Sequence, residues 1–231
     1  MISMLLSAAL LGSLPMPICA DDFSTEQPTS EERPMNGISP EGEKQFWSAE
    51  NQAKLARKIE SLKPYMGEKT LTRSGDRILN VPRYVQENGY YCVPASAQIL
   101  IQYVTGTKYS QTDLANAMGT NPSYGTYVDQ AAPVIAQLTG APYELGNNAQ
   151  SNFYNNMVAD INANYPVIYS VNSAVLNDGP NVGHAVVGIG YGDNGMTWFW
   201  DVNGAKATDI WYCTADEMSN ALNANGGYYI F

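Results

Sequence analysis

The spacing of hydrophobic and polar residues changes near residue 165. Before it, apolar side chains recur three and four positions apart, the spacing of one buried helix face, which predicts helices over 92–104, 111–118, 127–138 and 151–164. After it, short runs rich in Val, Ile, Tyr and Trp are broken by Gly, Asn and Asp, which predicts strands over 166–171, 184–191, 197–202, 209–212 and 227–231. Helices followed by antiparallel strands indicate an α+β domain with two lobes.

The segment before this domain has a different pattern. Residues 21–40 are rich in Asp, Glu, Ser, Thr and Pro, which predicts a flexible acidic linker. Residues 41–63 place acidic side chains early, basic ones late and apolar ones at helical spacing, which predicts one amphipathic helix ending near Pro64. We therefore expect an N-terminal helical segment over 41–77, serving as a propeptide or as a brace, and a main domain over 78–231.

Residues 1–20 contain no charged side chain, carry an apolar run over 5–14 and end in small residues before an acidic pair. This pattern predicts a signal peptide cleaved after Ala20, and therefore a secreted protein. The apolar run is too short to span a bilayer, so no transmembrane segment is expected in the mature chain. A lipid anchor on Cys19, which would leave the protein attached to the cell envelope, is the less favoured alternative because Pro17 and Ile18 suit that signal poorly.

Charge and histidine content exclude several classes of function. The formal net charge is -10 and the pI is near 4.4, whereas a nucleic-acid-binding surface needs clustered Lys and Arg. The chain has a single histidine, His184, which excludes metal sites built on two or three histidines. The glycine-rich run over 188–193 is not followed by a predicted helix, so it does not indicate a dinucleotide site. We expect a monomer without metal or cofactor.

The cysteines have two interpretations. Removal of the signal peptide would leave Cys92 and Cys213, which could form a structural disulfide in a secreted protein. Cys92, however, directly precedes a predicted helix whose first turn contains Pro94, and a helix N-terminus favours a nucleophilic thiolate. Cys213 precedes Thr214, which we expect to cap another helix, and is predicted to be a buried structural thiol.

Three other side chains complete a candidate catalytic group. His184 stands at the start of a predicted strand, and Asp201 on the next strand could accept a hydrogen bond from its ring, with Asn203 as the alternative. Gln86 lies six residues before Cys92, close enough for its amide to join the Cys92 backbone N–H in binding a developing oxyanion.

The order and spacing of these residues resemble the papain-like cysteine peptidases. The segment ILNVPRYVQENGYYCVPASAQILIQYVTG is similar to the branch related to the double-glycine leader peptidases, which process bacteriocin precursors, and the resemblance extends over residues 78–231. It implies a papain-like two-lobed fold, a protein or peptide substrate, Cys92 as nucleophile, His184 as general acid and base, Asp201 as its orienting group and Gln86 in the oxyanion hole. Tyr91 and Val93 depart from the small residue or Trp that often flanks the nucleophile.

Two other functions remain open from the sequence. A papain-like fold could transfer its acyl group to an amine or act as an amidase, because all these reactions pass through a thioester on the same triad. A Cys92–Cys213 disulfide would instead indicate a catalytically inactive, secreted binding module.

Overall fold

The computed structural model describes residues 35–66, 76–192 and 195–231. Several predicted features lie outside these residues. They are the signal peptide with Cys19, the linker as far as residue 34, and residues 67–75, which come just before the predicted start of the domain at residue 78. The helices and strands are, in chain order, α1 (Pro40–Phe46), α2 (Ala49–Leu62), a 3-10 turn (Lys63–Tyr65), β1 (Arg77–Ile78), α3 (Cys92–Thr105), α4 (Gln111–Ala117), α5 (Val128–Thr139), β2 (Leu145–Asn147), α6 (Phe153–Asn162), β3 (Val167–Asn172), α7 (Ser173–Asn177), β4 (Gly183–Gly192), β5 (Met196–Asp201), β6 (Trp211–Thr214), α8 (Ala215–Asn223) and β7 (Tyr228–Ile230).

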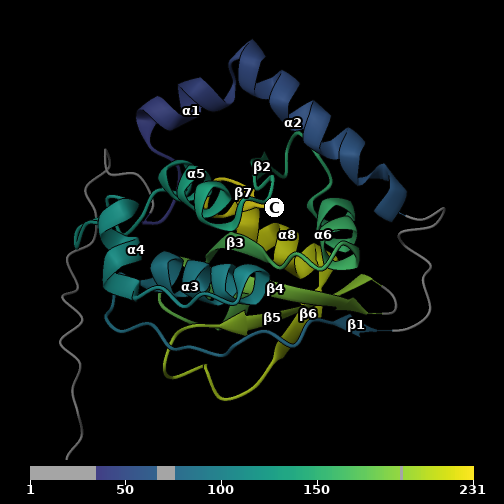
Figure 1. Cartoon of the computed structure of the whole chain (residues 1–231). Helices are drawn as coiled ribbons and strands as arrows, with labels where there is room; N and C mark the ends of the chain where they lie inside the picture. Colours follow the sequence, from purple (N-terminus) through teal and green to yellow (C-terminus); the bar gives the residue numbers. More distant parts are fainter. Residues whose placement is uncertain (1–34, 67–75, 193–194) are drawn as a thin grey trace, which may run out of the picture. The chain divides into compact units, whose positions relative to one another are not determined.

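The strands form one antiparallel sheet in the order β2-β7-β3-β4-β5-β6, with β1 also paired to β4 (Figure 1). All ten residues of β4 are buried, which accounts for its nearly continuous apolar sequence. Its register places Val171 of β3 opposite His184 and Asp201 of β5 opposite Val186. We call these strands the sheet lobe.

Helices α3, α4 and α5 form a helical lobe that packs on this sheet. The first ten residues of α3 are all buried, and α3 contacts β4, α4 and α5. Gly106 ends α3 in the left-handed conformation (φ 76°), which glycine adopts without steric cost. The mixed helical and antiparallel architecture confirms the predicted α+β fold, with one lobe beginning at Cys92 and the other carrying His184 and Asp201. Among the described residues, no helix has the length and apolar content needed to cross a membrane.

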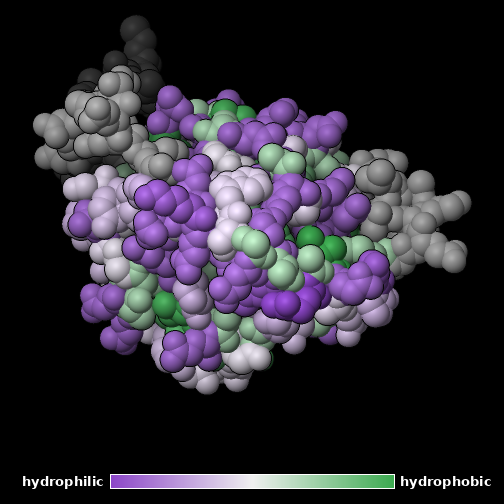
Figure 2. All heavy atoms as spheres, turned by 90° about the horizontal axis from the view of Figure 1, so that it is seen from above, coloured by the Kyte–Doolittle hydropathy of each residue, from purple (hydrophilic) through white to green (hydrophobic). Residues whose placement is uncertain are grey.

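The N-terminal helical segment differs from the prediction of one helix. The chain forms two helices, α1 and α2, because Ser48 leaves the helical conformation (ψ 150°) and caps α2 by accepting a hydrogen bond from the Asn51 N–H. Ser39 caps α1 in the same way through the Gly42 N–H. These helices contact α5 and α6, and the face of the molecule on which they lie is mainly hydrophilic (Figures 1 and 2).

The end of the predicted linker is packed against the rest of the protein. Asn36 is fully buried, and Ile38 belongs to the hydrophobic core. Ser39 donates hydrogen bonds to Asp129 on α5 from both its backbone N–H (2.8 Å) and its hydroxyl (2.7 Å). The polar composition of residues 21–40 predicts a linker without fixed contacts. These last residues instead contact distant parts of the chain, which a local sequence pattern does not reveal. Residues 36–39 therefore pack with the domain, although the sequence analysis places them in the linker.

Candidate active site

Cys92 is the first residue of α3 and is almost fully buried, with 2% of its surface exposed. The preceding Tyr91 occupies the N-cap position but makes no side-chain capping bond. No capping side chain therefore competes for the first-turn N–H groups, and the positive end of the helix dipole is directed at the thiol. The structure thus places Cys92 at a helix N-terminus, as predicted.

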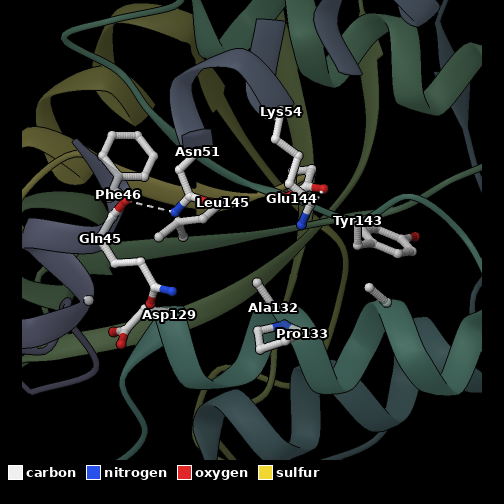
Figure 3. A pocket seen from close by; sticks show the side chains of 12 residues that line it. Gln45, Phe46, Asn51, Lys54, Asp129, Ala132, Pro133, Tyr143, Glu144 and Leu145 are labelled. Atoms are coloured by element: carbon white, nitrogen blue, oxygen red, sulfur yellow. Dashed lines mark hydrogen bonds and ion pairs between the residues drawn. The ribbon is translucent and has the colours of Figure 1, made fainter. Parts of the chain in front are cut away.

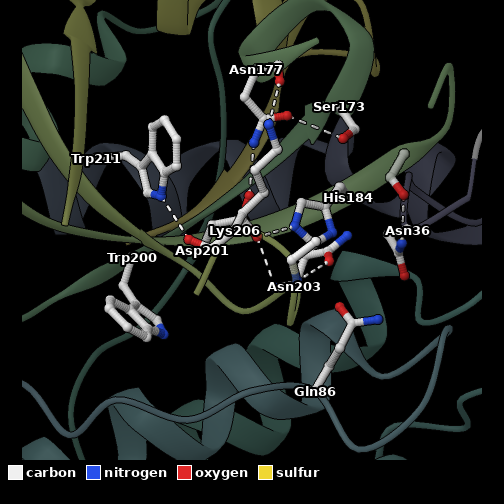
Figure 4. A network of polar contacts seen from close by, with 12 residues as sticks. Asn36, Gln86, Ser173, Asn177, His184, Trp200, Asp201, Asn203, Lys206 and Trp211 are labelled. Atoms are coloured by element: carbon white, nitrogen blue, oxygen red, sulfur yellow. Dashed lines mark hydrogen bonds and ion pairs between the residues drawn. The ribbon is translucent and has the colours of Figure 1, made fainter. Parts of the chain in front are cut away.

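His184 and Asp201 are in direct contact at the ends of neighbouring strands. The distance from His184 Nε2 to Asp201 Oδ1 is 2.7 Å, and both side chains are buried (Figure 4). Cys92 is near enough to the imidazole to help raise its pKa through hydrogen bonding and charge. Because Nε2 faces Asp201, we infer that Nδ1 faces the thiol. The helical and sheet lobes therefore bring the three predicted residues together in the order thiol, imidazole, carboxylate.

The two partners of His184 determine its ionisation. Burial disfavours the imidazolium, but hydrogen bonds and charges from Asp201 and Cys92 outweigh burial and raise the pKa of His184. Burial likewise opposes ionisation of Asp201, yet the hydrogen bond and charge of His184, together with bonds from the Asn203 N–H and the Asn177 amide, lower its pKa. The site therefore favours a charged imidazolium beside an ionised carboxylate.

Asn203 and Asn177 both support Asp201. The Asn203 backbone N–H donates to Asp201 Oδ1 (2.8 Å), whereas the Asn203 side chain accepts from the Ala205 N–H. The histidine therefore contacts Asp201 and not the alternative, Asn203. Asn177, at the end of α7, donates from its amide to Asp201 Oδ2 (2.8 Å), so both carboxylate oxygens have donors. The sequence analysis missed Asn177 because nothing in the sequence distinguishes it from the other asparagines of residues 172–181.

The loop carrying Gln86 is fixed from two sides. The Gln86 backbone N–H donates to the Val202 carbonyl (2.8 Å), just after β5. On the other side, the buried Gln111 of α4 accepts from the Glu87 N–H and donates to the Val85 carbonyl, each at 2.8 Å. The Gln86 side chain extends toward His184, and its Nε2 donates to the Asn88 carbonyl (3.0 Å) (Figure 4).

Both Cys92 and Cys213 are free thiols. Cys213 lies on β6 opposite Thr197, four residues along β5 from Asp201. At a strand rise of about 3.3 Å per residue, this separation is roughly 13 Å along the sheet. Cys213 is half-buried and not fully buried as predicted, while Thr214 and Glu217 form the predicted capping box of α8. The structure therefore does not contain the disulfide on which an inactive binding module would depend.

A separate cavity of about 180 Å³ lies between the N-terminal helices and the α5–β2 region (Figure 3). Its lining includes Asp129, which binds Ser39, and the Lys54–Glu144 ion pair (2.9 Å). None of the candidate catalytic residues lines it. In the described parts of the chain, no group of three or more His, Cys, Asp or Glu side chains is arranged to hold a metal ion.

Three solved structures are similar to this chain, and the first of them shares its fold. A putative C39-like peptidase from Bacillus anthracis has a TM-score of 0.53 and 18% identity, with 68% of this chain and 96% of that chain covered. The peptidase domain of Streptococcus ComA, described as a bi-functional ABC transporter involved in quorum sensing, has a TM-score of 0.45 and 19% identity, covering 64% of this chain and 95% of that chain. Bromelain from Ananas comosus has a TM-score of 0.43 and 15% identity, covering 67% of this chain and 93% of that chain.

The sequence comparisons match a family model but no individual curated protein. No curated protein sequence matches the chain. The model of the Peptidase_C39 like family matches residues 78–229, which include Gln86, Cys92, His184 and Asp201. This match covers most of the chain and agrees with the fold shared with the Bacillus anthracis protein. The chain belongs to the Peptidase_C39 like family.

Proposed function

We propose that this protein is a secreted cysteine peptidase that hydrolyses peptide bonds through Cys92, His184, Asp201 and Gln86. The observation that carries the proposal is the position of His184, which lies between the Asp201 carboxylate at 2.7 Å and the Cys92 thiol at the start of α3. A nucleophile, a base and an orienting group in this order are what covalent catalysis by a thiol requires. Membership of a peptidase family favours a protein or peptide as the substrate.

The acylation step follows from this geometry. The Cys92 thiolate attacks the scissile carbonyl carbon, and the carbonyl oxygen becomes an oxyanion. The His184 imidazolium then gives its proton to the departing amine as the C–N bond breaks, which leaves a thioester on Cys92 and a neutral imidazole. Asp201 holds the ring in one orientation and stabilises its charged form. Asn177 and the Asn203 N–H fix Asp201 in turn.

Deacylation uses the same groups in reverse. Neutral His184 removes a proton from a water molecule, whose oxygen attacks the thioester, and the acid product leaves as the Cys92 thiolate and the imidazolium are restored. In both steps the oxyanion would accept hydrogen bonds from the Cys92 backbone N–H and from Gln86. The Gln86 amide nitrogen carries two hydrogens, so its bond to Asn88 leaves one for the substrate.

Incubation of the purified protein with a mixed peptide library tests the reaction class. We expect new peptide termini to appear, with one oxygen of each new carboxyl group derived from water in an H₂¹⁸O experiment. The reaction should be absent from a Cys92→Ala sample. Products joined to an added amine, without hydrolysis, would instead establish the acyltransferase alternative. Absence of any Cys92-dependent product across the library would contradict the proposal.

Replacement of Gln86 by alanine is expected to lower kcat by about 10²–10³-fold with little change in KM, because an oxyanion donor acts mainly in the transition state. Steady-state kinetics on a peptide cleaved by the wild-type protein would measure this effect. Gln137→Ala, a change at an exposed position on α5, is the matched control and should leave both constants unchanged. Equal kinetics for the two variants would remove Gln86 from the mechanism.

A further inference from the structure

Asn36 is a buried polar residue that the proposed mechanism does not use. It is fully buried, adopts the left-handed conformation (φ 56°) and lies outside the residues matched by the family model. Its side chain and main chain together make four hydrogen bonds, two to the sheet lobe and two to the segment that leads into the helical lobe. Figure 4 shows Asn36 beside His184.

The bonds to the sheet lobe end next to the catalytic histidine. Asn36 Nδ2 donates to the carbonyl of Gly183 (3.0 Å), the residue directly before His184, and the Asn36 carbonyl accepts from the Ser170 hydroxyl of β3 (2.6 Å). The Val182 carbonyl accepts from the N–H of Ser173, the residue just after β3. Because successive carbonyls alternate along a strand, the Gly183 carbonyl points away from β3. On the other side of β4, pairing with β5 begins only at Val186. Neither neighbouring strand therefore donates a hydrogen bond to the Gly183 carbonyl, and Asn36 supplies that donor.

The other two bonds reach the segment before α5. The Asn36 N–H donates to the Tyr124 carbonyl (3.0 Å), and Asn36 Oδ1 accepts from the Thr126 N–H (2.9 Å). Two residues after Thr126, α5 begins, and α5 packs on α3, the helix that starts at Cys92. Asn36 thus connects the start of the strand bearing His184 to the lobe bearing Cys92.

Two glycines make room for this connection. A Cβ added to Gly183 would lie 1.6 Å from the Met35 carbonyl oxygen, and one added to Gly125 would lie 2.2 Å from Asn36 Oδ1. The backbone carbonyl of Met35 cannot yield as a flexible side chain would, so Gly183 must lack a side chain while the segment is in place. Gly125 is also in the left-handed conformation (φ 70°), which glycine adopts without steric cost. This close approach indicates that residues 35 and 36 are an integral part of the folded domain.

We propose that Asn36 is a positioning residue that holds the two lobes at the separation required for the contact between Cys92 and His184. The inference rests on the proposed function for the roles of those two residues. It also assigns residues 35–66 to the active enzyme, as a brace and not as an inhibitory propeptide. The contacts of Ser39 with Asp129 and of Lys58 with Asp160 hold the same segment against α5 and α6.

Asn36→Gly in the full chain tests this role. Glycine retains the left-handed backbone at no steric cost but removes the amide, which leaves the Gly183 carbonyl and the Thr126 N–H without partners. Asn164→Gly is the matched control, because Asn164 is also left-handed (φ 68°) but is exposed and bonds to Arg77. The probe is iodoacetamide, with modification of the Cys92 peptide followed by mass spectrometry from pH 5 to 9.

In Asn36→Gly we expect alkylation of Cys92 at pH 6 to slow by roughly ten- to a hundredfold, because displacements of about 1 Å have effects of this size. The C2-proton resonance of His184, the single histidine, should titrate at lower pH, since the contact with Cys92 that raises its pKa is weakened. The control should behave as wild type in both measurements. Asn36→Ala, which also removes both side-chain bonds and adds no charge beside His184, should show the same losses if the glycine variant does not fold.

The outcomes separate this inference from the proposed function. If wild-type Cys92 is alkylated much faster than Cys213 while both Asn36 variants match wild type in rate and in the His184 titration, the positioning role is overturned and the proposed function stands. If wild-type Cys92 reacts no faster than Cys213, the proposed function fails, and the positioning role fails with it.

Discussion

Cys92→Ala is expected to lower kcat for peptide hydrolysis by about a millionfold, the effect typical of removing the nucleophile of a catalytic triad. No other described cysteine can replace it, since Cys213 lies on β6, away from His184. Alanine should fit the site without strain, because it only removes the sulfur atom from a position at a helix start where alanine is well tolerated. Kinetics with an excess of a cleaved peptide would measure the loss.

Cys213→Ala is the control for this experiment. Burial, with the nearby Glu217 charge, raises the pKa of the Cys213 thiol to about 12, so this thiol stays protonated near neutral pH. We expect its removal to leave kcat and KM unchanged. Residual activity of Cys92→Ala within tenfold of wild type would contradict the assignment of the nucleophile, and so would an equal loss in both variants.

Lys58→Met is expected to lower the free energy of unfolding by about 3–5 kcal/mol, because it leaves a buried carboxylate without its cation. Lys58 on α2 and Asp160 on α6 pair at 3.1 Å with only 5% and 0% of their side chains exposed. The Lys58 ammonium also lies 5.2 Å from the centre of the Phe231 ring. Methionine preserves most of the side-chain volume, so the loss of unfolding free energy can be attributed to removal of the Lys58 charge. Urea unfolding followed by circular dichroism would measure it.

The pH dependence of this variant follows from Asp160. Burial raises the pKa of Asp160 to about 6 in the folded protein, although Lys58 lowers it, and the unfolded value is near 4. A raised carboxyl pKa gives a stability contribution that is complete below about pH 4 and is lost as the pH rises through about 6. Without Lys58 the pKa of Asp160 should rise further. Lys58→Met should therefore lose more stability at pH 8 than at pH 5.

Two further variants make the test specific. Lys58→Met combined with Asp160→Asn removes both charges and should recover much of the stability, because no uncompensated charge stays buried. Lys63→Met breaks an exposed pair with Glu60 and should change the unfolding free energy by less than about 1 kcal/mol. A Lys58→Met effect no larger than that of Lys63→Met would show that α2 is not held by the buried pair.

Local sequence patterns were sufficient to predict much of the fold. The helix beginning at Cys92 was predicted to within one residue at its end, since its apolar face is continuous and Pro94 suits a first turn. The contact of His184 with Asp201 could also be predicted, because the two residues lie on strands that follow each other in the sequence and pair in the sheet. The break at Ser48 was missed because Trp47 continued the apolar pattern of one helix.

Other features depend on contacts that no local pattern carries. Strands β1 and β2, of two and three residues, are too short to show an alternation and are defined by pairing with distant strands. Asn177 is one of several asparagines in residues 172–181, and its role appears only when α7 directs it at Asp201. Asn36 bonds to Gly183, 147 positions away, so its place beside the active site follows from the tertiary fold alone.

Substoichiometric alkylation coupled to activity tests the central claim most directly. The full chain is treated with half an equivalent of iodoacetamide at pH 6.5, the modified residue is identified by mass spectrometry, and hydrolysis of a cleaved peptide is measured on the same sample. The account predicts modification of Cys92 alone, Cys213 remaining intact, and a loss of hydrolysis in proportion to the modified fraction. Modification of Cys213 first, a Cys92–Cys213 disulfide in the active protein, or full hydrolysis after alkylation of Cys92 would contradict it.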